Sequence, residues 1–224
     1  MTESPPIQPP PSPGVHTHKM ETNPDTNGKL SLDPLLQAAR RHGVEVGEWS
    51  ARIGRELGLD AHRLSRLTLA AQLHDVGKVD VPRHILLKPG PLDAEEWRIV
   101  RRHPEAGARI LSDPFFDDIR AFVLHHHERF DGGGYPCGLF GPAIPLEASI
   151  ISVADSWCAM ISDRPYRAAM SEERAREELA RCSGSQFDPQ CVDVLVVLTL
   201  SRSAPARPGE RPRLRVVAPA RLAA

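Results

Sequence analysis

Hydrophobic residues recur every three or four positions from about residue 34 to residue 200, which is the spacing of amphipathic α-helices. No segment of any length alternates apolar and polar residues as a half-buried strand does. The pattern predicts an all-α fold, a helical bundle. The first helix is expected from Pro34, behind an Asp33 cap, to about Leu57, before Gly58. Its apolar face is Val46, Trp49, Ile53 and Leu57.

Capping residues and prolines delimit the other predicted helices. Asp93 and Glu96 have the spacing of a capping box, and Pro104 predicts that the helix they open ends near His103. Asp113 with Pro114 is typical of another helix start. The expected helices after the first are 61–76, 93–103, 113–126, 147–163, 171–182 and 189–200, with a Gly/Pro-rich loop over 130–146.

The two ends of the chain differ in composition from its middle. Residues 1–30 are polar and rich in proline, so they lack the apolar area that folding requires and are predicted to be disordered. Residues 202–224 are rich in Arg, Pro and Ala and are also predicted to be a disordered tail. The folded domain is therefore expected over 31–201.

Charge and cysteine content exclude several classes of protein. The formal net charge of -1 gives no basic field for a nucleic-acid polymer. No apolar run is long enough for a bilayer, and the N-terminus lacks a signal-peptide pattern. The four cysteines have no metal-binding spacing and are expected to be reduced thiols. We expect a cytoplasmic protein with no membrane or nucleic-acid partner.

Candidate metal ligands are spread through the middle of the chain. Imidazole and carboxylate together suit manganese, iron and zinc, and the absence of cysteine argues against a closed structural zinc site. Five histidines and two aspartates are too many for one tetrahedral ion but fit two ions that share a carboxylate, as in phosphate-ester hydrolysis. The candidates are His42, His74, Asp75, His103, His126, His127 and Asp155.

Two of these residues have an informative local context. His74 continues the apolar face of its predicted helix and is expected to point into the core, while Lys78 places a cation near the same helix end. Asp155 lies in an apolar helix, where a buried carboxylate needs a metal or a charged partner. An ion pair with an arginine is the alternative explanation for Asp155.

The segments LHDVGKVDVP, HHERFDGGGYP and DRPYR resemble, in order and spacing, the HD-GYP family, a branch of the HD phosphohydrolase superfamily. The resemblance covers residues 40–200. It implies an HD-type helical bundle and a bacterial phosphodiesterase that hydrolyses cyclic di-GMP, a signalling second messenger, to pGpG or GMP.

The resemblance also implies roles for the candidate ligands, with iron or manganese as the metal. One ion would be held by His42, His74, Asp75 and Asp155, and the other by Asp75, His103, His126 and His127. Some family members have a glutamate one helical turn before the first histidine that helps to hold a third ion. Ala38 stands there, so we expect two ions.

The substrate contacts implied by the resemblance are basic or belong to the GYP loop. Lys78 matches a lysine that contacts the scissile phosphate, and Arg164 and Arg167 match positions that hold the dinucleotide. Tyr135 and Pro136 match the loop that shapes the site and contacts partners such as diguanylate cyclases. Three alternatives stay open: a low-activity module that binds cyclic di-GMP or a cyclase, a mononucleotide phosphohydrolase, and cyclic GMP-AMP as substrate.

Overall fold

The computed structural model describes residues 34–163 and 168–203. Within these ranges the secondary structure is helical, apart from one isolated bridge between Ser183 and Phe187, so the predicted all-α fold is confirmed. No helix in these ranges is long and apolar enough to cross a membrane. The Asp33 cap, residues 1–30 and all of the C-terminal tail from residue 204 lie outside the described residues.

The helices of the described residues are joined by connections that are mostly short, apart from the long loop 126–140 between α6 and η3. Three of them, marked η, are 3-10 helices. In chain order they are α1 (Pro34–Glu56), α2 (Ala61–Leu73), η1 (Val76–Asp80), α3 (Arg83–Leu86), α4 (Ala94–Val100), α5 (His103–Ile110), η2 (Pro114–Phe116), α6 (Asp117–His125), η3 (Gly141–Ala143), α7 (Leu146–Ile161), α8 (Glu172–Arg181) and α9 (Pro189–Ser203).

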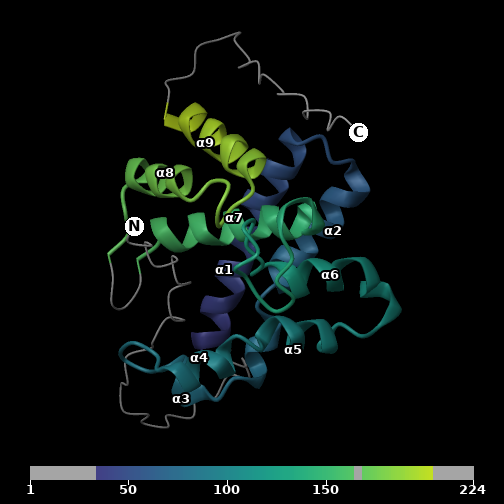
Figure 1. The fold of residues 1–224 in the computed structure, drawn as a ribbon, viewed down its shortest axis with the longest axis vertical. Helices are drawn as coiled ribbons and strands as arrows, with labels where there is room; N and C mark the ends of the chain where they lie inside the picture. Colours follow the sequence, from purple (N-terminus) through teal and green to yellow (C-terminus); the bar gives the residue numbers. More distant parts are fainter. Residues whose placement is uncertain (1–33, 164–167, 204–224) are drawn as a thin grey trace, which may run out of the picture.

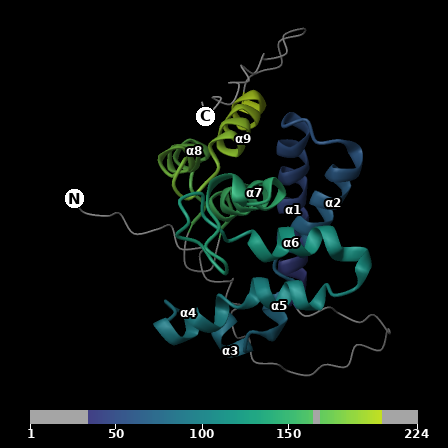
Figure 2. The same cartoon turned by 45° about the vertical axis from the view of Figure 1, so that its right-hand side comes forward.

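Helix α7 forms the centre of the core. Ile150, Ile151 and Trp157 are fully buried, and Ile150 and Ile151 point about 100° apart, so α7 is buried over much of its surface. Its half-buried Ser152, Asp155 and Ser156 line a cavity. Helix α1 packs against both α2 and α7, and its predicted apolar face is confirmed by the buried Val46 and Ile53. Figures 1 and 2 show α8 and α9 beyond one side of α7 and α3, α4 and α5 on the opposite side.

Two local predictions differ from the structure. Pro104 was expected only to end a helix, but it lies in the first turn of α5, where its missing N–H has no intrahelical acceptor to lose. The preceding helix, α4, ends at Val100 and has the predicted capping box. Helix α2 ends at Leu73, so Asp75 lies in the turn between α2 and η1.

Candidate metal centre

The turn between α2 and η1 carries His74 and Asp75 into the interior. His74 is only 1% exposed, and its Nδ1 donates a hydrogen bond to the Ala71 carbonyl at 2.7 Å. The following turn lies directly on the start of α5, because an added Cβ at Gly77 would be 1.9 Å from the His103 carbonyl oxygen. Glycine at this position therefore sets the separation between the Asp75 turn and His103.

His103 and His126 are oriented in the same way as His74. His103 Nδ1 is 2.8 Å from the Val100 carbonyl oxygen, and His126 Nδ1 is 2.7 Å from that of Val123. Each Nδ1 must carry the proton that it donates, so each Nε2 presents a lone pair when the ring is neutral. Burial lowers the pKa of His103 to about 4 and that of His126 to about 3, which keeps both rings neutral near pH 7.

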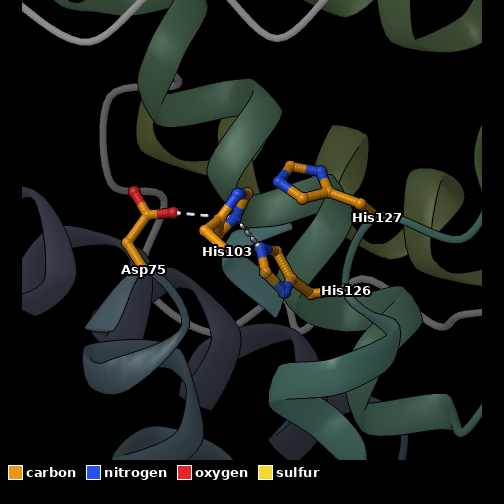
Figure 3. Close-up of side chains that lie close together, drawn as sticks. All are labelled: Asp75, His103, His126 and His127. Atoms are coloured by element: carbon orange, nitrogen blue, oxygen red, sulfur yellow. Dashed lines mark hydrogen bonds and ion pairs between the residues drawn. The ribbon is translucent and has the colours of Figure 1, made fainter. Parts of the chain in front are cut away.

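The side chains of His103 and His126 point toward each other beside Asp75 (Figure 3). His103 Nε2 lies 3.4 Å from His126 Nε2 and 3.4 Å from Asp75 Oδ1. His74 Nε2 is buried and has no hydrogen-bond partner among the described residues. Facing nitrogen lone pairs beside a carboxylate, with each ring held by a backbone carbonyl, are the donor arrangement of a divalent metal site. The residues present therefore fit a metal.

Asp75 belongs to two groups of potential ligands. Ligand atoms of Asp75, His103, His126 and His127 all lie within 4.8 Å of one another, and those of His42, His74 and Asp75 form a second such group. Asp155 adjoins the second group. The structure brings together all seven candidates proposed from the sequence, which come from α1, the α2–η1 turn, α5, the end of α6 and α7.

Asp155 is paired with a histidine. Its Oδ1 lies 2.9 Å from His42 Nε2 and 4.0 Å from His74 Nε2. Burial alone would raise the pKa of Asp155, but the hydrogen bond and charge of His42 lower it well below its usual range. The same pairing raises the pKa of His42 against the opposing effect of burial. The arginine ion pair considered from the sequence is not formed among the described residues.

Lys78 lies beside the shared carboxylate. Its Nζ donates to Asp75 Oδ2 at 2.6 Å, across one turn of η1. Burial would raise the pKa of Asp75, but Lys78 and the neighbouring histidines lower it well below its usual range, so Asp75 is ionised. Lys78 and Asp75 both line a cavity of about 870 Å³, together with Asp155, His127, Tyr135 and Arg101. The metal-ligand cluster is thus open to a sizeable ligand.

The loop that follows His127 folds back onto the cluster. The ring of Tyr135 stacks on that of His127, with centroids 4.9 Å apart and an interplanar angle of 24°. Tyr135 Oη is buried and has no hydrogen-bond partner among the described residues. Burial raises the pKa of Tyr135, so the phenol is protonated and presents a donor.

Glu128 holds this loop in place, a role that the sequence did not reveal. Its buried carboxylate accepts hydrogen bonds from the backbone N–H groups of Cys137 at 2.7 Å and Leu139 at 3.1 Å. The HHE run contains Glu128, but nothing in the run indicates which later amides it contacts. The sequence also did not reveal that the guanidinium of Arg101 lies over the ring of Tyr135 in this loop, 5.5 Å from its centroid. Arg164 and Arg167 lie outside the described residues.

Comparison with known proteins relates this chain to HD domains and to cyclic-dinucleotide phosphodiesterases. The HD domain family profile matches residues 29–191. The cyclic di-GMP phosphodiesterase response regulator RpfG of Xanthomonas campestris is 44% identical over 147 residues, covering 64% of this chain and 39% of RpfG. The 3′3′-cGAMP-specific phosphodiesterase 2 of Vibrio cholerae is 37% identical over 158 residues, covering 69% of this chain and 30% of that protein.

A solved structure shares the fold. An HDG"Y"P protein from Bdellovibrio bacteriovorus superposes with a TM-score of 0.60 at 24% identity, covering 72% of this chain and 52% of that one. The chain spans well under half the length of the two curated relatives. An HD domain implies a divalent metal site, in agreement with the histidine and aspartate cluster. The chain belongs to the HD domain family, and its cyclic-dinucleotide phosphodiesterase relatives agree with the resemblance of its motifs to the HD-GYP branch.

Proposed function

We propose that the chain is a metal-dependent phosphodiesterase that hydrolyses cyclic di-GMP to pGpG, GMP or both. The observation that carries the proposal is the carboxylate of Asp75, which belongs to both ligand groups and borders the cavity beside Lys78. This arrangement suits two ions that share one carboxylate, and we propose iron or manganese from the imidazole and carboxylate donors. The name of RpfG supports the substrate.

The metal ligands and Lys78 would have different roles in hydrolysis. When bound, the two ions would supply Lewis acidity for the phosphoryl oxygens and a water of lowered pKa. Asp75 directs Oδ1 toward His103 and Oδ2 toward His74, so one carboxylate would supply a ligand to each of the two groups. Lys78 would exchange Asp75 for an oxygen of the scissile phosphate and stabilise the negative charge that develops there.

Tyr135 would add a neutral donor to the same phosphate. Its protonated Oη lacks a partner among the described residues, so a phosphate or ribose oxygen would satisfy it. The stacked His127 ring holds the phenol in one orientation, which reduces the entropy lost when substrate binds. Arg164 and Arg167 remain proposed contacts for the rest of the dinucleotide.

Turnover by the purified protein tests the proposal. Protein prepared without oxygen should hydrolyse cyclic di-GMP and contain two equivalents of iron or manganese. Asp75→Ala should abolish hydrolysis and lower the metal content, because both ions lose a ligand. Asp80→Ala is the matched control, since Asp80 ends η1, the helix that Asp75 precedes, but forms a surface pair with Arg109. Binding of cyclic di-GMP without turnover would contradict the enzyme assignment.

Cyclic GMP-AMP is a second candidate substrate, favoured by the Vibrio cholerae relative. Both cyclic dinucleotides contain two phosphodiesters, so the metal centre alone does not discriminate between them. Comparing kcat/KM for the two substrates under identical metal loading decides the preference. A mononucleotide hydrolysed faster than either would contradict the proposed substrate class.

We also propose that the exposed part of the GYP loop contacts a protein partner such as a diguanylate cyclase. Phe140 supports this because 68% of it is exposed, an unusual position for a large apolar ring. Phe140→Ser should weaken binding of a purified diguanylate cyclase and leave cyclic di-GMP turnover unchanged. Equal affinity of the wild-type and Phe140→Ser proteins for the cyclase would contradict the proposal that the loop contacts it.

A further inference from the structure

Arg101 is positioned between two aromatic rings at the cavity wall. It directly follows α4, and its guanidinium carbon lies 5.5 Å from the ring centroid of Tyr135 and 5.9 Å from that of Trp97. The Tyr135 ring in turn stacks on His127, a member of the metal-ligand cluster. Both distances are within the range of cation–π attraction, which restricts the guanidinium to this part of the wall.

Within residues 34–163 and 168–203, no neighbouring carboxylate neutralises the charge of Arg101. Among the described residues no Asp or Glu forms an ion pair with it, although it lines the same cavity as Asp75. Two other cations that line the cavity are paired, Lys78 with Asp75 at 2.6 Å and Arg129 with Asp131 at 2.6 Å, whereas Arg40 and Arg41 line it from α1, away from the Tyr135 ring that Arg101 contacts. A partly fixed, unpaired guanidinium in a cavity favours an anion, above all one with two oxygens for its fork of N–H donors.

We infer that Arg101 binds the second, non-scissile phosphate of a cyclic dinucleotide. The inference rests on the proposed function, in which Lys78 and the ions hold the scissile phosphate. The Tyr135 ring contacts both His127 of the metal-ligand cluster and Arg101, whereas Arg101 belongs to neither ligand group, so Arg101 would contact a different part of a ligand from the one at the metal centre. A cyclic dinucleotide has a second phosphodiester to place there, whereas a simple diester has none.

Steady-state kinetics of Arg101→Ala test the inference. KM for cyclic di-GMP should rise about tenfold while kcat changes little, since the contact is made in ground and transition states alike. Arg101→Lys should restore only part of the affinity, because an ammonium lacks the planar fork. Arg102→Ala is the matched control: Arg102 is the adjacent residue, is exposed and does not line the cavity. An unchanged KM in Arg101→Ala would overturn the inference.

Two further substrates separate phosphate binding from other roles. Bis(p-nitrophenyl) phosphate has a single phosphate, so its kcat/KM should be the same in Arg101→Ala and wild type. An equal loss on this substrate would show that Arg101 acts on the metal centre or the fold. Cyclic di-GMP and cyclic GMP-AMP should be affected by the same factor. A loss confined to cyclic di-GMP would mean that Arg101 reads guanine, and would overturn the assignment to phosphate.

Binding measurements distinguish failure of this inference from failure of the proposed function. If the wild-type protein does not hydrolyse cyclic di-GMP, the proposed function fails and Arg101 is judged by calorimetric affinity. A tenfold weaker affinity in Arg101→Ala then supports the inference, and an equal affinity refutes it. No binding by the wild-type protein would overturn both.

Discussion

Replacing Gly77 by alanine should damage the metal site from a position that contributes no ligand. The new Cβ would be 1.9 Å from the His103 carbonyl oxygen and 2.4 Å from the Gly107 nitrogen, both backbone atoms of α5. Real Cβ atoms essentially never approach closer than 3.0 Å. The turn and α5 must therefore separate by about 1.1 Å, from 1.9 to 3.0 Å, because close-packed backbone cannot give way locally. His103 would move away from Asp75 by a similar distance.

Two measurable losses follow from this displacement. Overpacking typically costs about 1–3 kcal/mol of the free energy of unfolding, and a backbone clash is expected at the upper end, with a drop of about 6–12 °C in melting temperature. A misplacement of about 1 Å reduces turnover by about 100-fold.

Thermal denaturation and cyclic di-GMP turnover, with metal content measured on the same samples, check both losses. Gly90→Ala is the control, since a Cβ there meets nothing within 4 Å. A Gly77→Ala protein with wild-type melting temperature and turnover would refute the reasoning.

Three other changes have distinct expected results. Lys78→Ala should lower kcat about 100-fold with little change in KM, because Lys78 acts on charge that develops in the transition state; unchanged kcat in steady-state kinetics would exclude this role. Glu128→Gln should lower the free energy of unfolding by about 1–3 kcal/mol, since an amide has one acceptor oxygen where the carboxylate uses two, and it should reduce turnover by loosening the Tyr135 loop. Chemical denaturation measures the first effect and steady-state kinetics the second, and wild-type values for both would contradict the prediction. Removing metal with a chelator should lower the melting temperature, because the facing Nε2 atoms of His103 and His126 then lack a cation, and adding manganese should restore it. The melting temperature of an Asp75→Ala protein should fall less on chelation. An unaltered melting temperature in the wild-type protein would argue against a metal at this position.

The helical core was predictable because its signals are local. Val46 and Ile53 are buried on one face of α1, as their spacing indicates, and periodic burial needs no knowledge of distant contacts. Helix α5 was missed because proline has two meanings in a helix. Pro104 disfavours helical geometry in the residue before it and also suits the first helical turn, and only the packing of α5 against η1 shows which meaning applies.

The site was predictable in its residue types and much less so in its contacts. The metal-ligand candidates were found because histidine and aspartate in apolar helices are costly without a partner. Whether Asp155 pairs with arginine or faces histidine depends on how α1 packs on α7, which the sequence does not specify. The same limit applies to Glu128, whose hydrogen-bond donors are in a loop, and to Arg101, which contacts Tyr135 only after the loop folds back.

Metal binding and folding share the same contacts here, so their effects should not be additive. The cluster draws on α1, the α2–η1 turn, α5, the end of α6 and α7, and a bound ion would tie these elements together. If Gly77→Ala acts partly by moving His103 away from the ion, chelation should lower the melting temperature of wild type more than that of the variant. The difference that remains without metal would then measure the backbone clash itself. Equal effects of chelator on both proteins would mean that the clash is absorbed without disturbing His103, and that the metal centre tolerates movement of α5.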